Sequence, residues 1–351
     1  MTQFTVLGVG VLTAVVSWLG VAAVRRVAER RHILDLPGAR SLHTRPVPRG
    51  GGLAVVMVCL GALLGLRFVG LPSSPLLGGW VVVGGVLVAS VSWVDDLHSL
   101  PVVARLAVHV AAAGCVLVAV GATQVTDIPL LGELHLVWLG PPVVLLWVVG
   151  LTNAYNFMDG IDGIAAAQAI VAGFGFFILP CADVAVRWLG VVLAAGCVGF
   201  LLHNWQPARI FLGDVGSAFI GYLLASLTVI ANGKDPRFAA FGILLVWPFV
   251  FDAGFTLLRR LCHGEDVFAA HRSHFYQRLV IAGWQHWAVT VLYGSLAVFG
   301  VALAISWLRG GLLASVVVVA GLSLAAMGLW LTVLLSERIG ASQRARNGTR
   351  H

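Results

Sequence analysis

The sequence predicts an all-α integral membrane protein with about eleven transmembrane helices, an N-terminus outside the cell and a cytoplasmic C-terminus. Hydrophobic residues make up 59% of the 351 positions and charged residues only 11%, whereas a soluble domain carries about a quarter charged residues. The mean hydropathy is +0.96. Such a chain cannot cover a water-facing surface, so most of its surface must face lipid. No polar stretch is long enough for a separate soluble domain, and we therefore expect one membrane domain over residues 1–351.

The apolar segments of the chain are long enough to be spans, since a crossing needs roughly 20 mostly apolar residues. The first segment is followed rather than preceded by an arginine pair, which is the reverse of a cleaved signal peptide, so we keep it as a span. One interpretation of the outer loop at 123–138 is a small hairpin. The expected spans are 4–24, 51–69, 78–94, 102–122, 139–157, 164–180, 186–203, 215–232, 237–258, 284–305 and 311–335.

The basic residues predict the orientation of these spans. Of the 22 lysines and arginines, all but five lie in or beside the segments that face inward when the N-terminus is outside, as the positive-inside rule requires. The net charge of +7 therefore reflects membrane orientation, and we expect no nucleic-acid partner. The five exceptions are Arg67, Arg187, Lys234, Arg237 and Arg309.

Acidic residues collect on the same inward side, although the positive-inside rule says little about them. Acids at helix ends beside a membrane are costly unless they are hydrated, paired or bound to a cation. Those from separate loops predict one assembled site: Asp95, Asp96, Asp159, Asp162, Asp214, Glu265 and Asp266. The loops that we expect to build it are 25–50, 95–101, 153–163, 204–217 and 259–283.

Carboxylates lie at the end of one span and inside another. Asp95 and Asp96 close the third span in VDDLHSL, and two adjacent carboxylates repel each other unless a cation or basic group lies beside them. A solvated helix end is the alternative explanation. Asp252, in WPFVFDAG, is the one acid placed within a span, where acids are functional or paired by default. Because it is near the inner end, a solvated position is the alternative.

The segment NAYNFMDGIDG places Asn153, Asn156, Asp159 and Asp162 at intervals of three. This spacing aligns the side chains on one face of a tightly wound turn, and nearly so on an α-helix. Amide and carboxylate oxygens offer a hard oxygen face to Mg²⁺, or donors and acceptors to a nucleobase and sugar. The alternating acids of an EF-hand are missing. A purely structural capping cluster is the alternative.

The segment FLGDVGS leads into the eighth span. Asp214 could cap that helix, which is the structural explanation. The start of the helix would also favour an anion such as a diphosphate. Phe211 offers a flat face to a ring such as uracil.

Two basic loops complete the pattern. In HRSHFYQR, a helix would place His271, His274 and Arg278 on one face, where they predict a phosphate clamp rather than a zinc site, because no third ligand is suitably spaced. In HTRPVPRGGG, Arg45 and Arg49 precede the second span and are suited to the anionic head of a lipid. Anchoring to the membrane surface by basic residues is the alternative for both loops.

Together these motifs resemble the polyprenyl-phosphate N-acetylhexosamine-1-phosphate transferase superfamily, glycosyltransferase family 4. RPVPRGGG, DDLHSL, NAYNFMDGIDG, FLGDVGS and HRSHFYQR occur in the family's order over roughly residues 40–280. The histidine loop looks closest to the branch that initiates lipopolysaccharide O-antigen, since the consecutive histidines of the muramoyl-pentapeptide branch are missing. The family's eleven spans and its orientation agree with the spans expected here.

The resemblance implies a role for each motif residue. The catalytic residues are Asp95 and Asp96, which orient or deprotonate the lipid phosphate, Asp159 near the diphosphate, and His271 and His274. The metal ligands are Asn156 and Asp214, for Mg²⁺ or alternatively Mn²⁺. The residues implied to bind substrate are Asn153, Asp162, Phe211, Arg272, Arg278, Arg45 and Arg49.

The expected activity is transfer of a HexNAc-1-phosphate from a UDP-N-acetylhexosamine to undecaprenyl phosphate with release of UMP, at the cytoplasmic face of a bacterial inner membrane. A double displacement through Asp95 or Asp159 is the alternative within this chemistry. A transporter of lipid phosphate or nucleotide sugar is the alternative from another class, although we find no clear internal repeat. A catalytically dead scaffold is the third, although no motif has lost an acid. A homodimer remains open.

Overall fold

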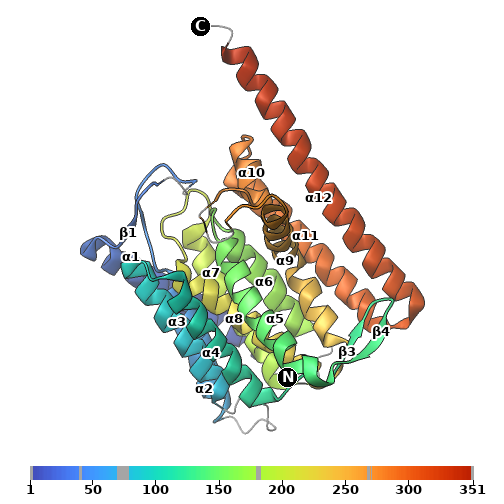
Figure 1. Cartoon of the computed structure of the whole chain (residues 1–351). Coiled ribbons are helices and arrows are strands. Elements are labelled where there is room, and N and C mark those ends of the chain that lie inside the picture. The colour runs from blue at the N-terminus through green and yellow to red at the C-terminus, as the bar shows by residue number, and fades with distance from the viewer. Residues whose placement is uncertain are drawn as a thin grey trace.

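A bundle of helices makes up nearly the whole chain (Figure 1). The structure is a computed structural model and describes residues 3–38, 42–68, 79–178, 183–266, 269 and 271–348. Each expected span contains one helix, and α10 is an additional short helix. The helices are α1 (Gln3–Arg31), α2 (Gly52–Leu66), α3 (Trp80–His98), α4 (Val102–Val120), α5 (Gly140–Phe157), α6 (Ile164–Ile178), α7 (Val184–Asn204), α8 (Asp214–Asn232), α9 (Phe238–Cys262), α10 (Phe275–Ile281), α11 (His286–Arg309) and α12 (Gly311–Gly348).

The lengths of these helices revise the expected number of crossings. Within the described residues, 9 helices are long and apolar enough to cross a membrane, whereas α2 and α6 are apolar but have only 15 residues each. A helix of that length spans about 22 Å, against about 30 Å for the hydrocarbon core. The chain is therefore an all-α multi-pass membrane protein with about 9 candidate spanning helices.

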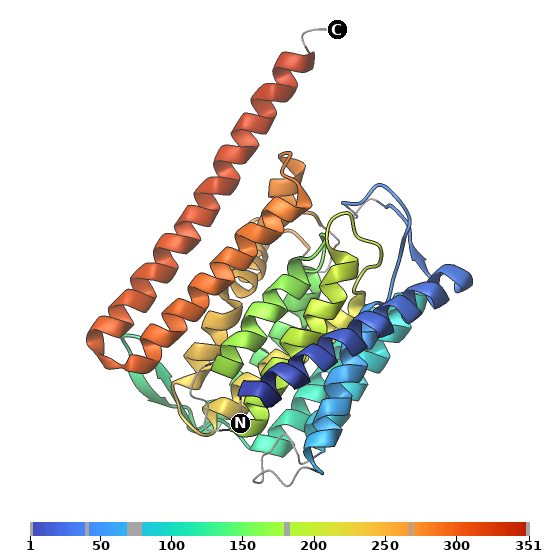
Figure 2. The same cartoon turned by 180° about the vertical axis from the view of Figure 1, so that it is seen from behind.

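Two terminal helices are longer than the apolar segments that predicted them. α1 continues to Arg31 and α12 to Gly348. Hydropathy marks only the part of a helix that faces lipid, but arginine and glutamate are good helix formers, so the helix continues past the apolar segment. As a result α12 projects beyond the rest of the bundle, as Figures 1 and 2 both show.

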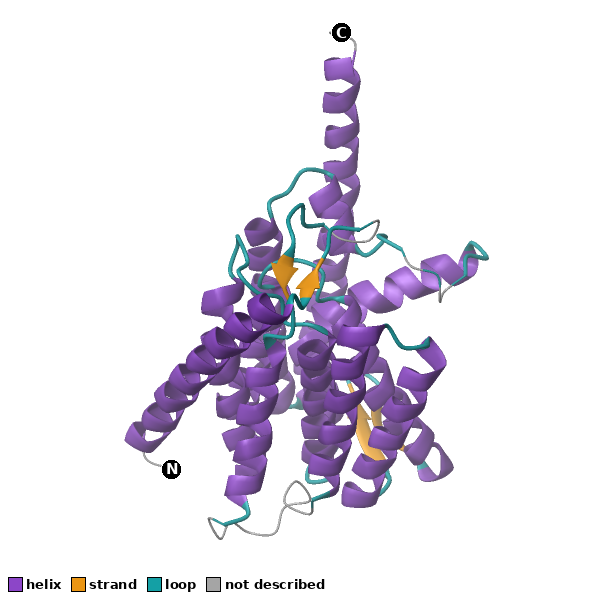
Figure 3. Ribbon diagram, turned by 90° about the vertical axis from the view of Figure 1, so that its left-hand side faces the viewer, coloured by secondary structure: helices purple, strands orange, loops and turns teal. Residues whose placement is uncertain are grey.

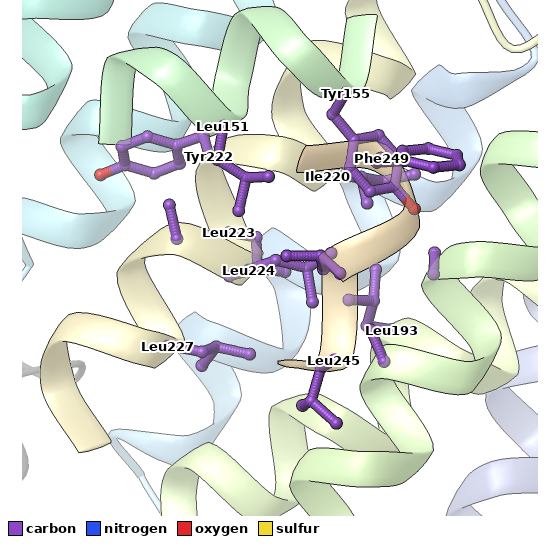
Figure 4. Close-up of a cluster of buried hydrophobic side chains, with 14 of the residues drawn as sticks. Leu151, Tyr155, Leu193, Ile220, Tyr222, Leu223, Leu224, Leu227, Leu245 and Phe249 are labelled. Carbon is purple, nitrogen blue, oxygen red and sulfur yellow. The ribbon is translucent and has the colours of Figure 1, made fainter. Parts of the chain in front are cut away.

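Helix α8 lies at the centre of the bundle. All of its residues from Val215 to Asn232 are buried, and a helix that is apolar on all sides belongs in a core. Figure 4 shows side chains of α5, α7 and α9 packed with those of α8, including Tyr155, Leu193 and Phe249. The first turn of this central helix therefore has a fixed position, and it carries the FLGDVGS motif.

Glycines bring the start of α2 against the start of α8. A Cβ at Gly52 would collide with the backbone of Gly216, so neither helix tolerates a side chain at this crossing. The backbone N–H groups of Gly51 and Gly52 donate to the carbonyls of Phe211 (2.9 Å) and Leu212 (2.8 Å). The RPVPRGGG and FLGDVGS motifs are thereby joined.

Two short hairpins lie at opposite ends of the bundle (Figure 3). β1 (Leu34–Asp35) pairs with β2 (Val47–Pro48), in antiparallel orientation, beside the loops that carry the motifs. β3 (Val125–Ile128) pairs with β4 (Gly132–His135), which confirms the hairpin expected at 123–138, and the 3₁₀ helix η2 (Val137–Leu139) follows it. The motif loops thus gather at the end from which α12 projects, opposite β3–β4 (Figure 1).

Candidate functional site

A cavity of about 460 Å³ opens among the motif loops. Its wall contains residues from three of the five expected loops, 25–50, 153–163 and 204–217, so segments far apart in the sequence do build one site. Neither the 95–101 loop nor the HRSHFYQR loop contributes a residue to the described wall. The lining residues are Asp35, Leu36, Gly38, Leu42, His43, Arg49, Asp159, Gly160, Ile161, Asp162, Asn204, Phe211, Leu212, Gly213, Asp214 and His286.

Asp96 holds the floor of this cavity together. Its carboxylate is fully buried and lies 2.7 Å from Nε of Arg49. It also accepts the backbone N–H groups of Asp214 (2.9 Å) and Val215 (3.0 Å), which are two unpaired donors at the start of α8. The capping role that the sequence suggested for Asp214 is therefore wrong, because Asp96 caps this helix from α3.

Asp214 is left free to face two arginines. Its carboxylate lies 3.0 Å from Nη2 of Arg49 and 3.6 Å from Nη1 of Arg105. The same Arg105 nitrogen lies 2.6 Å from Asp95, whose side chain is almost fully buried. Burial lowers the pKa of Arg49, but the charges of Asp96 and Asp214 outweigh this effect and raise it above its ordinary value.

Arg105 is a site residue that the sequence interpretation missed. The sequence shows it only as a basic residue near the inner face. The available signal was its place in the first turn of α4, directly after the loop that follows the two adjacent acids. Arg105 pairs with both Asp95 and Asp214, so it is the basic partner that the neighbouring carboxylates were expected to need.

Asp159 lies in the turn that follows α5 and is half-buried. Burial raises its pKa well above the ordinary value, and the negative charges of Asp214 and Asp96 raise it further. A carboxylate that is destabilised in this way would be stabilised by a bound cation. The cavity around Asp159 therefore has too little positive charge to balance its carboxylates.

Asn156 lies beside the first turn of α8. Its Oδ1 accepts from the hydroxyl of Ser217 at 3.1 Å, and Ser217 follows Asp214 by three residues on the same helix. Asn156 and Asp214 are therefore brought to the same end of one helix. Asn153 lies one turn earlier in α5, outside the cavity wall, where its amide donates to the carbonyl of Val149 at 2.7 Å.

Asp162 fixes the far side of the cavity. One of its oxygens accepts the backbone N–H of Ala208 at 3.1 Å, and the other lies 3.4 Å from Nδ1 of His286. His286 begins α11, about 120 residues away, and nothing in its local sequence predicted its place in the wall. His43 also lines the cavity, with its ring edge-on to Phe211 at 4.9 Å between centroids.

The HRSHFYQR loop is not helical from its start, so the prediction of one shared face for its basic residues is wrong. Helix α10 begins only at Phe275, after His274 in extended backbone. Arg278 pairs with Glu337 of α12 through two contacts of 2.8 Å, and its guanidinium lies over the ring of Phe275. His271 and His274 do lie together, 4.9 Å apart between ring centroids.

Two other arginines predicted to bind substrate lie outside the cavity wall. Arg45 is exposed. Arg272 donates to the carbonyl of Gly38 at 3.0 Å, which connects the histidine loop to the segment after β1. Of the predicted arginines, Arg49 alone lines the cavity in the part of the chain that the structure describes.

The donor set of the cavity fits a hard divalent cation. Its described wall carries four carboxylates, Asp35, Asp159, Asp162 and Asp214, against one guanidinium. Within the described residues no three His, Cys, Asp or Glu side chains form a ready metal cluster. Mg²⁺ is usually held by one or two carboxylates together with water and substrate phosphates, so a preformed cluster is not required.

Comparisons with known proteins show the family of this chain. Residues 79–232 match the family model for glycosyl transferase family 4. The chain is 29% identical over 276 residues to a probable undecaprenyl-phosphate N-acetylglucosaminyl 1-phosphate transferase of Bacillus subtilis (strain 168), covering 77% of this chain and 76% of that protein. It is 30% identical over 336 residues to the decaprenyl-phosphate N-acetylglucosaminephosphotransferase of Mycobacterium tuberculosis (strain ATCC 25618 / H37Rv), covering 85% of this chain and 82% of the relative.

A third relative represents another branch. The chain is 31% identical over 182 residues to the phospho-N-acetylmuramoyl-pentapeptide-transferase of Latilactobacillus sakei, covering 49% of this chain and 53% of that protein. These similarities favour an enzyme over a transporter. The chain belongs to glycosyl transferase family 4, and within it to the polyprenyl-phosphate N-acetylhexosamine-1-phosphate transferases.

Proposed function

We propose that this protein transfers N-acetylglucosamine-1-phosphate from UDP-N-acetylglucosamine to a polyprenyl phosphate, releases UMP, and so begins the assembly of a cell-envelope glycan. The observation that carries the proposal is the ion pair of Arg49 with Asp96 and Asp214 at the floor of a cavity on one end of the bundle. The names of the Bacillus and Mycobacterium relatives support undecaprenyl or decaprenyl phosphate as the acceptor.

The reaction is an attack by one phosphate on another. The acceptor phosphate is already an anion at neutral pH, so little proton transfer is needed. The barrier comes mainly from repulsion between the two negative groups, and charge at the reacting atoms lowers it. Arg49 and Arg105 both reach Asp214 from outside the helix that carries it, so both guanidinium groups are held where the diphosphate would lie.

A divalent cation, Mg²⁺ or alternatively Mn²⁺, would be held by Asp214, which lines the cavity, and by Asn156, which contacts Ser217 in the first turn of the same helix. When bound, it would neutralise the diphosphate and the developing charge on the leaving UMP. Asp159 would face the same charge from the turn after α5. The excess of carboxylates in the wall supports this assignment, since a dianionic nucleotide would otherwise be repelled.

The far side of the cavity is suited to the nucleoside. Phe211 and the edge-on ring of His43 provide an aromatic surface for a uracil ring. Asp162 offers carboxylate oxygens to the ribose or base, and its bonds to Ala208 and His286 fix its orientation. Asp95 would act on the acceptor phosphate, whereas Asp96 would act by holding Arg49 and the first turn of α8.

The proposed orientation places this cavity at the cytoplasmic face of a bacterial plasma membrane, with the N-terminus outside and eleven crossings, two of them by the short helices α2 and α6. The support is that the site loops, rich in arginine, share one end of the bundle with the projecting part of α12 (Figure 1). One substrate is soluble and the other is embedded in lipid, so the site must lie at this boundary.

The test is transfer from radiolabelled UDP-sugars by the purified protein, with undecaprenyl and decaprenyl phosphate as acceptors and Mg²⁺ present. We expect labelled lipid from UDP-N-acetylglucosamine, and exchange of labelled UMP into the donor. No transfer from any UDP-N-acetylhexosamine would overturn the proposal. We also propose O-antigen as the downstream glycan, which is tested by complementation of a strain that lacks its own O-antigen initiating enzyme. A homodimer is a separate proposal, which is tested by the mass of the detergent-solubilised protein.

A further inference from the structure

Asp252 is a buried acid of α9 outside the cavity wall, and five donors surround it. Its Oδ1 accepts the backbone N–H of Phe275 (2.8 Å), and its Oδ2 accepts the backbone N–H of Tyr276 (3.2 Å) and the hydroxyl of Tyr293 (2.6 Å). The remaining two donors, at 3.2 and 3.3 Å, are Thr256 Oγ1 and His274 Nδ1. The residue has an exposed fraction of 0%, so the solvated position considered from the sequence is wrong.

The contact with Asp252 determines the tautomer and the orientation of the His274 imidazole. Both oxygens of Asp252 act as acceptors, so the Nδ1 atom that faces them is the ring nitrogen that carries a proton. The imidazole also accepts the backbone N–H of Gln277, in the capping box at the start of α10. The ring of His271 lies beside it, 4.9 Å away between centroids. A carboxylate that fixes the tautomer and orientation of a histidine is a common supporting arrangement in active sites.

The first turn of α10 carries the effect of Asp252 to the cavity. Tyr276, whose backbone N–H binds Asp252, donates its own hydroxyl to the carbonyl of Phe157 at 3.0 Å. The same hydroxyl occupies the space that a Cβ at Gly160 would need. Gly160 lines the cavity next to Asp159. One buried carboxylate thus holds the histidine loop and, through Tyr276, the turn that carries Asp159.

We propose that Asp252 is a positioning residue for sugar-phosphate transfer, which holds the imidazole of His274 in one tautomer and orientation. This inference rests on the proposed function and adds a residue from the interior of α9 to the site. A purely structural cap for α10 is the competing explanation. The two differ in a single respect: a positioning residue loses its effect on turnover when His274 is removed, whereas a structural cap does not.

The experiment is a double-mutant cycle with Asp252→Asn, His274→Gln and the double variant, measured as kcat and KM for UDP-N-acetylglucosamine over a range of pH. We expect Asp252→Asn to lower kcat by about tenfold or more, because a misplaced tautomer in a carboxylate–histidine pair costs up to about 10⁴-fold. The pH dependence of kcat should change shape, and KM should change little. In the His274→Gln background, Asp252→Asn should have a much smaller effect on kcat.

Two controls keep the outcome clear. Thr256→Val removes another donor to Oδ1 but leaves both Asp252 and His274 in place, and it should retain kcat and its pH profile. Asp252→Glu keeps an acceptor and should recover part of the kcat that Asp252→Asn loses. Equal effects of Asp252→Asn in both backgrounds, or a fall in the unfolding midpoint with unchanged kcat per folded molecule, would overturn the inference. Absence of transfer in the wild type would instead count against the proposed function itself.

Discussion

Nη2 of Arg49 lies 3.0 Å from Oδ1 of Asp214, although 165 positions separate the two residues in the sequence. The pair joins the glycine-rich loop before α2 to the first residue of α8. The same guanidinium reaches Asp96 at 2.7 Å, so one arginine holds two carboxylates from different helices. The first two predictions concern these three side chains.

Replacing Arg49 with lysine should lower kcat/KM about 100-fold or more, since removal of one preorganised donor costs about 10²–10³-fold. Lysine keeps the charge but cannot reach two carboxylates with a planar group. Arg45→Lys is the matched control, because Arg45 belongs to the same loop and is exposed. Steady-state kinetics with both variants test this; a greater loss from Arg45→Lys would contradict the site.

Asp96→Asn and Asp214→Asn should separate stability from turnover. Asp96 is fully buried and caps α8, so its replacement should lower the free energy of unfolding by about 3–5 kcal/mol. Asp214 is partly exposed and caps nothing, so Asp214→Asn should unfold near the wild-type temperature yet have no measurable transfer activity. Thermal unfolding in detergent and transfer assays on the same samples give the comparison. Full activity of Asp214→Asn would remove it from the site.

The pKa of Asp159 predicts a pH-dependent stability. Because the pKa is raised in the folded state, the group contributes stability that is complete below its unfolded pKa, near 3.8, and is lost as the pH rises through the folded value. Unfolding temperatures in EDTA should therefore fall as the pH rises from acid to neutral. Asp159→Asn should reduce this slope, and burial of Asp214, which raises the pKa of that carboxyl to about 7, accounts for part of what remains. An unchanged slope in the variant would show that Asp159 is not the titrating group.

Removal of divalent cations should abolish transfer, and Mg²⁺ or Mn²⁺ should restore it. Binding to the folded state alone raises its stability, so Mg²⁺ should also raise the unfolding temperature of the wild type. Asp214→Asn should lose this rise, because the variant lacks a charged oxygen of the proposed cation site. Arg278→Gln is the control for a change far from that site. A rise of equal size in wild type and Asp214→Asn would argue against the assigned ligand.

The pair of Arg278 with Glu337 should stabilise the fold without binding substrate. Both Arg278→Gln and Glu337→Gln should lower the free energy of unfolding by about 1 kcal/mol, since the glutamate is partly exposed. The double variant should lose little more than either single one. KM for the UDP-sugar should stay within about twofold of wild type. A much larger KM for Arg278→Gln alone would support the substrate contact that the sequence suggested.

The helices of this protein were largely predictable from its sequence. Apolar length decides where a span lies, and each expected segment contains one helix. Two predictions failed for local reasons. Helices α2 and α6 are shorter than the length needed for a full crossing. Residues 271–273 are not helical, although the spacing of the basic residues in this loop fitted a helix. Helix ends depend on capping partners, and Asp252, which caps α10, is more than twenty residues away.

The sequence by itself determined that this chain lies in a membrane, which segments are helices, and that acids and arginines of several loops form one site. Only the tertiary structure decided what each charged group does. Asp95 and Asp96 are neighbours, yet one pairs with Arg105 and the other caps α8 and pairs with Arg49. Consecutive residues of a helix point about 100° apart, so adjacent side chains meet different partners. Those partners come from helices that only the packed bundle brings together.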